Sequence, residues 1–205
     1  MLTATATANR THVEPLEAGT YPARCIQLID IGIQFNPLAN KNQRQVMLVW
    51  ELPTETIEID GEEKPRTISD TYTLSLNEKA KLYNILVSWR GKAFTDEELK
   101  GFDLQNILDK PCLLSLILKE SKNGNMYNRV KSVSKLMKGM TVDEAKNPIF
   151  SFDLDSKDAL EQMKVLPEWI QERIRGGETY KELAAKEAPK DEPDFTNLNP
   201  EELPF

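Results

Sequence analysis

The sequence predicts a mainly β protein on three observations. Five segments of strand length are rich in apolar and β-branched residues. Hairpin turn signals separate two pairs of them, at Asp60-Gly61 and Asn123-Gly124. One amphipathic helix lies between the third segment and the fourth. This order is typical of an OB-fold, a five-stranded Greek-key barrel, and we expect that fold with further helices toward the C-terminus.

Three strands are expected before the helix. The first opens at Gly19 and covers 19–33. An asparagine-rich loop over 35–44 separates it from a second strand over 46–52. After the acidic turn, the alternating residues 66–76 predict the third strand.

The first helix has the clearest pattern. Asn77 is placed to cap it and Gly91 to end it. Thr95 and Glu98 have capping-box spacing and predict a second, short helix. The apolar residues of the first helix recur at i, i+3, i+4 and i+7: Leu82, Ile85, Leu86 and Trp89.

Two strands and a helical region follow. Residues 112–120 and 126–136 predict the fourth and fifth strands. Residues 156–177 predict one or two amphipathic helices. Their expected apolar side comprises Leu160, Met163, Trp169, Ile170 and Ile174.

Length and composition fit one folded domain with an appendage. The chain has 205 residues, of which 40% are apolar and 29% charged. It contains no run of the roughly 20 apolar residues that a membrane-spanning helix needs. Residues 1–12 lack the apolar stretch of a signal peptide. We therefore expect a cytoplasmic protein without membrane contact.

Few residues favour enzyme chemistry. Cys25 and Cys112 lie in apolar runs without a CxxC pair or a neighbouring histidine, which favours buried thiols over zinc ligands. The single histidine, His12, lies in a polar arm, and the nine glycines form no phosphate-binding or hydrolase motif. We expect no catalytic residue, metal or cofactor. Chemistry by carboxylates and a metal stays open as an alternative, although the acids crowd into turns and the C-terminal segment.

Charge is distributed unevenly along the chain. Residues 1–147 hold 19 acidic and 19 basic side chains, whereas residues 148–205 hold 14 and 7. The net charge of −7 therefore belongs to the last quarter of the chain. Within the neutral part, residues 119–138 carry six basic side chains against Glu120 alone, so this segment is locally basic.

The fifth strand carries this basic segment. Alternation places Met126, Val130 and Ser132 on one face. The other face carries Tyr127, Arg129, Lys131, Val133 and Lys135. Cations beside an aromatic ring suit a single strand of nucleic acid, because cations neutralise phosphates and a ring stacks on any base. An ordinary solvated strand edge, where lysines discourage aggregation, fits the same pattern equally well.

The loops that border the binding face of an OB-fold are basic or neutral here. That face is formed by strands two and three with the loops between strands one and two and between strands four and five. Trp50 alternates with apolar neighbours, so a core position is open for it beside a stacking role. The candidate nucleic-acid contacts are Arg24, Phe35, Lys41, Arg44, Trp50, Tyr72, Lys122, Tyr127, Arg129, Lys131 and Lys135.

The C-terminal segment forms a second candidate site. The chain ends in an acidic stretch followed by an aromatic residue with a free carboxylate. Such a tip can fill an apolar pocket on a partner, whose basic side chains take the carboxylates; a merely solubilising tail is the alternative. The candidate partner-binding residues are Glu201, Glu202, Leu203, Pro204 and Phe205.

The ending PEELPF resembles the acidic C-terminal tip of bacterial and phage single-stranded-DNA-binding proteins. The segment 19–136 resembles the OB-fold domain of phage-type members, and LPEWIQERI is similar to a helical addition in some of them. The resemblance implies a protein of the bacterial host cytoplasm that coats single-stranded DNA during phage replication, recombination or repair. It also implies that the tip recruits replication or repair proteins. The chain departs from the bacterial members in its few aromatic strand residues and its neutral barrel.

The sequence divides into four expected parts. They are a flexible N-terminal arm (1–18), an OB-fold nucleic-acid-binding domain (19–140), a helical extension (141–180) and a disordered acidic tail (181–205). An OB-like module that binds proteins and not nucleic acid is the main alternative function. The extension leaves the oligomeric state open, so a homo-oligomer is compatible with the sequence.

Overall fold

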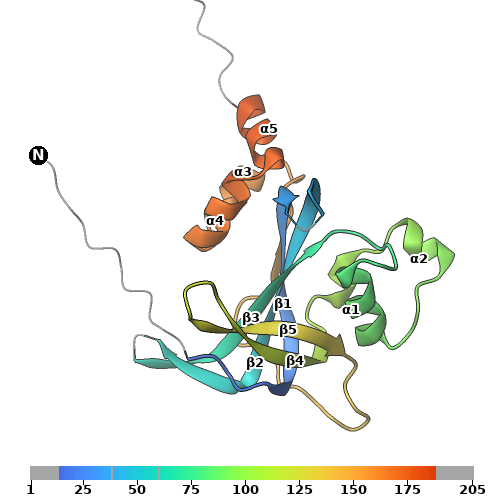
Figure 1. Ribbon diagram of the computed structural model, residues 1–205, viewed down its shortest axis with the longest axis vertical. Helices are drawn as coiled ribbons and strands as arrows, with labels where there is room; N and C mark the ends of the chain where they lie inside the picture. Colours follow the sequence, from blue (N-terminus) through green and yellow to red (C-terminus); the bar gives the residue numbers. More distant parts are fainter. Residues whose placement is uncertain (1–13, 38, 60, 188–205) are drawn as a thin grey trace, which may run out of the picture.

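The protein is described by a computed structural model that covers residues 14–37, 39–59 and 61–187. Within these residues, six strands form one sheet, and short helices lie against it (Figure 1). The strands are β1 (Gly19–Asn36), β2 (Lys41–Ile59), β3 (Glu62–Thr73), β4 (Pro111–Glu120), β5 (Met126–Ser134) and β6 (Phe150–Phe152). The helices are α1 (Lys81–Arg90), α2 (Asp96–Lys100), η1 (a 3-10 turn, Leu104–Ile107), α3 (Ala159–Met163), α4 (Glu168–Arg175) and α5 (Glu178–Glu187).

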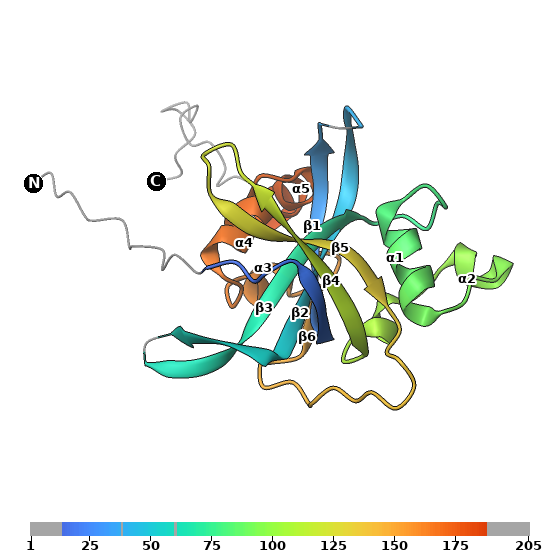
Figure 2. The same cartoon turned by 60° about the horizontal axis from the view of Figure 1, so that its bottom comes forward.

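Five antiparallel strands curl into a half-barrel in the order β3-β2-β1-β4-β5 (Figure 2). The long central strand β1 pairs with β4 from Gly19 to Arg24 and with β2 from Arg24 to Asn36. The edge strands β3 and β5 approach each other, but the described residues form no hydrogen-bonded ladder between them. The prediction of a mainly β fold with five such strands and α1 between β3 and β4 is confirmed.

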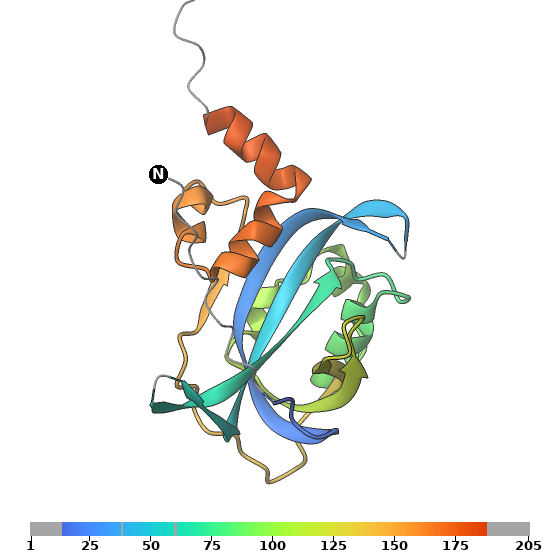
Figure 3. The same ribbon diagram turned by 60° about the vertical axis from the view of Figure 1, so that its left-hand side comes forward.

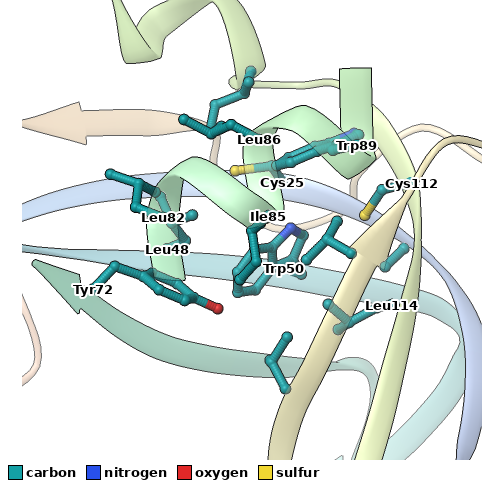
Figure 4. Close-up of a cluster of buried hydrophobic side chains, with 14 of the residues drawn as sticks. Cys25, Leu48, Trp50, Tyr72, Leu82, Ile85, Leu86, Trp89, Cys112 and Leu114 are labelled. Atoms are coloured by element: carbon teal, nitrogen blue, oxygen red, sulfur yellow. The ribbon is translucent and has the colours of Figure 1, made fainter. Parts of the chain in front are cut away.

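The inner face of the half-barrel holds the main core. Trp50 is 0% exposed and contacts Tyr72 and Trp89 with ring centroids 6.4 and 6.3 Å apart. Helix α1 closes the core with its four predicted apolar residues, which are all buried, and Figure 4 shows Ile85 beside Trp50. The predicted thiols Cys25 and Cys112 are both buried in this core, so the sequence interpretation of them is confirmed.

The outer face of β1 and β2 holds a second core. Ile26, Ile29 and Met47 are buried on this face under the C-terminal unit, which we define as residues 150–187 (β6 and α3–α5). From the C-terminal unit, Ile170 and Ile174 pack against these strands. The helical extension is therefore not a separate body: it covers β1 and β2, as Figure 3 shows.

Several local predictions can be compared with the structure. The capping box of Thr95 and Glu98 and the left-handed Gly91 at the end of α1 are confirmed. Asn77 does not cap α1; its carboxamide accepts a hydrogen bond from the Lys79 amide (3.0 Å) one turn earlier. The tail boundary expected at 181 falls inside α5, because the helix continues to Glu187.

The N-terminal arm and the C-terminal tail lie mainly outside the described residues. His12 of the arm and the tip 201–205 of the tail are not described, so the structure bears on neither. The last residues of the expected arm are described, and Leu16 exchanges two hydrogen bonds of 2.8 Å with the Asn128 side chain on β5. In the described part of the chain, no helix is long and apolar enough to cross a membrane.

Candidate nucleic-acid interface

Strand β5 presents the predicted aromatic and basic side chains to solvent. Tyr127 is 44% exposed, and Arg129 and Lys131 are also exposed. Lys122 is exposed in the β4–β5 hairpin loop. Because Tyr127 and Arg129 are two residues apart on a regular strand, they project to the same side. An aromatic ring and cations therefore stand together at one edge of the sheet.

The strict alternation predicted for the fifth strand is wrong beyond Lys131. The pairing with β4 shifts between Ser115 and Leu116, so the ladder skips Lys131. This bulge turns Val133 into the core, where it is 0% exposed. Met126, expected opposite Tyr127, is itself 45% exposed.

A cavity of about 460 Å³ lies between β3 and the start of β5. Met126 and Tyr127 line it on one side, and the exposed hydroxyl residues Thr67 and Ser69 of β3 line it on the other. Hydroxyl groups donate and accept hydrogen bonds and carry no charge. The cavity thus combines an aromatic ring with hydroxyl groups, and Glu14, Lys64 and Arg66 also line it.

A second cavity of about 250 Å³ adjoins the first over the outer face of β3. Thr67, Ser69 and Asn147 line both cavities, and the far wall of the second is Trp169 at the start of α4. We call the two adjoining cavities the β3 groove. In Figure 3, β3 runs between α4 and the β4–β5 hairpin loop. Trp169 belongs to α4 and Tyr127 to the start of β5.

Basic groups border the β3 groove, with acids among them. Lys64 and Arg66 line the larger cavity. Lys64 is paired with Glu62 at 2.9 Å, and Arg66 donates to the backbone carbonyl of Glu14 at 2.6 Å. Within the described parts of the chain, Arg129 and Lys131 form no ion pair, and both are exposed on β5. The cations of β5 are therefore the better placed groups for an incoming phosphate.

Two aromatic residues predicted as exposed rings are core residues. Trp50 is 0% and Tyr72 2% exposed, and both lie under α1 (Figure 4). Burial raises the pKa of the Tyr72 phenol, and neighbouring Asp70 raises it further. A stacking role for either ring is wrong in this structure, because no face of the ring is free for a base.

Two predicted arginine contacts have structural partners. Arg24 is mostly buried and donates to the Asp109 carboxylate at 2.9 Å and to the Val142 carbonyl at 3.0 Å. It thereby fastens the 141–149 segment to the barrel. Arg44 forms ion pairs with Asp30 and with Asp155 (2.8 Å), and these carboxylates raise its pKa. Both guanidinium groups are thus held by other parts of the chain, although the Arg44 side chain is 32% exposed. Their role as phosphate contacts stays a prediction.

The remaining predicted contacts lie away from the β3 groove. Phe35 and Lys41 are exposed at the tip of the β1–β2 hairpin, and neither lines either cavity of the groove. Lys135 follows the end of β5 and lines a different cavity beside Trp89 and Leu136. The structure thus brings together Tyr127, Arg129 and Lys131, with Lys122 in the adjoining loop. It does not bring these groups together with the hairpin tip.

The sequence interpretation missed three residues of the β3 groove. Thr67 and Ser69 alternate with Ile68 in a strand, a pattern that marks an exposed polar row. Trp169 was expected on the buried side of its helix, yet it is 45% exposed. The residue pattern of α4 did not indicate that Trp169 is exposed, because this residue directly precedes the buried Ile170.

Comparisons of the chain with protein-family models, with curated proteins and with solved structures gave no significant match.

Proposed function

We propose that this protein binds single-stranded DNA without sequence preference, and that its half-barrel is an OB-fold. The strand order β3-β2-β1-β4-β5 with a helix between β3 and β4 supports the OB-fold assignment. The resemblance of the PEELPF ending to single-stranded-DNA-binding proteins supports a role in phage DNA replication, recombination or repair. It is proposed to be a binding protein and not an enzyme.

The observation that carries this proposal is the exposed group on β5. Tyr127 lines a groove together with the hydroxyl residues Thr67 and Ser69. Arg129 and Lys131 are exposed farther along the same strand. An aromatic ring on a β-barrel surface stacks on bases of any identity. Cations beside it neutralise phosphates and release counterions, which gives affinity without reading sequence.

In the proposed mechanism, different residues contact the DNA backbone and the bases. Arg129 and Lys131, with Lys122 in the adjoining loop, hold phosphates along β5. Tyr127 then stacks on one base, whose edges meet the hydroxyl groups of Thr67 and Ser69. Because hydroxyl groups both donate and accept hydrogen bonds, they accommodate each of the four bases.

The C-terminal tip has a separate proposed role. Residues 201–205 combine two carboxylate side chains with a terminal phenylalanine, which suits an apolar pocket bordered by basic residues on a replication or repair protein. DNA binding by the barrel and partner binding by the tip are thus assigned to different ends of the chain.

A salt titration with dT and rU oligomers tests DNA binding. We expect the logarithm of the dT binding constant to fall linearly with the logarithm of salt concentration, with a slope of about −0.7 per phosphate contact. The double variant Arg129→Glu/Lys131→Glu should bind at least tenfold more weakly and with a slope shallower by about 1.4. Tighter binding of dT than of rU would support DNA as the natural ligand.

The matched control is Lys100→Glu, which reverses an exposed charge on α2, away from β5 (Figure 1). This variant should bind dT as the wild type does. Equal affinity of the wild type and the double variant would contradict the assignment of β5. No dT binding by the wild type at low salt would favour the alternative of a protein-binding module.

A further inference from the structure

Trp169 occupies an unusual position in α4. Its neighbours Ile170 and Ile174 are buried against β1 and β2, whereas Trp169 is 45% exposed. The other exposed side chains of the helix are charged, and Glu168 beside it is paired with Arg175 at 2.6 Å. Nearly half of the surface of this large residue is therefore open to solvent.

The ring faces a cavity and not an open surface. Among the residues that the structure describes, none that lines the cavity of about 250 Å³ beside Trp169 is charged. Thr67, Ser69 and Pro167 line it together with the ring. A neutral, partly apolar site with hydroxyl groups suits the flat, uncharged ring of a base better than it suits a phosphate.

This cavity is continuous with the proposed DNA site. Thr67, Ser69 and Asn147 line both cavities of the β3 groove, so Tyr127 and Trp169 border one polar row from its two sides. Asn147 is held in place because its amide and carboxamide donate to the buried Glu51 carboxylate at 2.8 and 2.7 Å. The floor shared by the two aromatic residues is therefore fixed.

We propose that the C-terminal unit completes the DNA-binding groove, with Trp169 stacking on a second base of the strand that Tyr127 engages. This inference rests on the proposed DNA binding and adds a binding residue to the same site. The unit then has two roles: its buried side covers the apolar outer face of β1 and β2, and the start of α4 forms one wall of the β3 groove.

Three substitutions test the role of the ring. Trp169→Ala should weaken dT binding about tenfold, the size expected for one lost base–aromatic stack. Trp169→Phe keeps a ring and should bind within about threefold of the wild type. Val165→Ala is the matched control, since Val165 is 80% exposed in the same unit and lines neither cavity of the groove; it should bind dT as the wild type does.

Photocrosslinking of the wild-type protein gives a readout that does not depend on a variant's folding. A dT oligomer containing 5-iodouracil, irradiated in the complex, should give an adduct on Trp169. Intrinsic fluorescence provides a second readout, because Trp50 and Trp89 are buried and only Trp169 is exposed among the three tryptophans. Quenching by dT should be present in the wild type and lost in Trp169→Phe.

The outcomes separate this inference from the proposed function. If the wild type binds dT but Trp169→Ala binds equally well, or no adduct forms on Trp169, the inference is overturned and DNA binding stands. An equal loss in Val165→Ala would also overturn it, because the effect would not belong to the ring. If the wild type binds no dT, both proposals fail.

Discussion

The guanidinium of Arg44 forms an ion pair with the carboxylate of Asp30 across the paired strands β1 and β2. Arg44 also contacts Asp155 at 2.8 Å and Asp153 at 3.6 Å, both from the segment that follows β6. Asp30 in turn accepts hydrogen bonds from the backbone amides of Gly32 and Leu154. The arginine therefore connects the β1–β2 hairpin to the C-terminal unit.

We expect Arg44→Met to lower the free energy of unfolding by about 2 kcal/mol, because Asp30 is nearly buried and loses its charged partner. Chemical denaturation measures this loss. The affinity for dT should change less than twofold. Lys100→Met, which removes an exposed pair with Glu97, should cost less than about 0.5 kcal/mol. A tenfold loss of dT binding at unchanged stability would instead identify Arg44 as a phosphate contact.

The junction of α4 and α5 depends on a glycine. A Cβ atom on Gly177 would lie 2.9 Å from the Ile33 carbonyl oxygen of β1 and 2.4 Å from the Gln34 carboxamide nitrogen. On Gly176 it would meet only ordinary contacts, the nearest at 3.5 Å. The backbone of α4 can approach β1 this closely only because residue 177 has no side chain.

Gly177→Ala should therefore loosen the C-terminal unit and lower stability by about 1–3 kcal/mol. Gly176→Ala should be nearly neutral and is the matched control. Hydrogen exchange of the 168–187 amides measures the loosening, which should be faster only in Gly177→Ala. Equal exchange in the two variants would show that the close approach does not hold the unit in place.

The two thiols should be unreactive in the folded protein. Burial raises the pKa of the Cys25 thiol to about 12 and that of Cys112 well above its usual range. Since the thiolate is the reactive form, a raised pKa leaves almost none of it at pH 8. Ellman's reagent should label neither cysteine between pH 7 and pH 9, and both after unfolding in urea. Rapid labelling of the native protein at pH 8 would contradict this burial.

The acidic C-terminal segment should compete with DNA at low salt. Residues 188–205 contain five acidic side chains and one basic side chain, tethered to a protein with a cationic strand. Deleting them should tighten dT binding severalfold at about 20 mM salt, with the difference vanishing near 300 mM because salt screens the attraction. Fluorescence anisotropy at both concentrations measures it, and equal affinity of the two proteins at low salt would exclude the competition.

Local sequence patterns predicted the secondary structure well. The spacing of Leu82 and Trp89 identified α1, and Asn123-Gly124 located the turn between β4 and β5. These features depend on neighbouring residues in the chain, so a sequence contains them. The bulge at Lys131 could not be read in this way, because it is defined by the pairing partner on β4.

Whether each tryptophan side chain is buried or exposed was harder to predict from the sequence. Trp50 lies on a strand whose residues 46–52 are buried on both faces, so its direction depended on which face α1 covers. Trp169 is exposed although its helix is amphipathic, because its position lies at the margin of the helix face that packs on the sheet. The continuous apolar runs in β1 and β2 were the one signal that both faces of these strands need a cover.

The sequence by itself determined the strands, the turns, the first helix and the locally basic strand β5, because hydrophobic periodicity and turn residues act over a few positions. Only the tertiary structure decided which charges are free. Arg24 and Arg44 are occupied by carboxylates and carbonyls that lie far away in the chain, whereas Arg129 remains exposed. The same holds for the β3 groove, whose walls Tyr127 and Trp169 are brought together only when the C-terminal unit packs on the sheet.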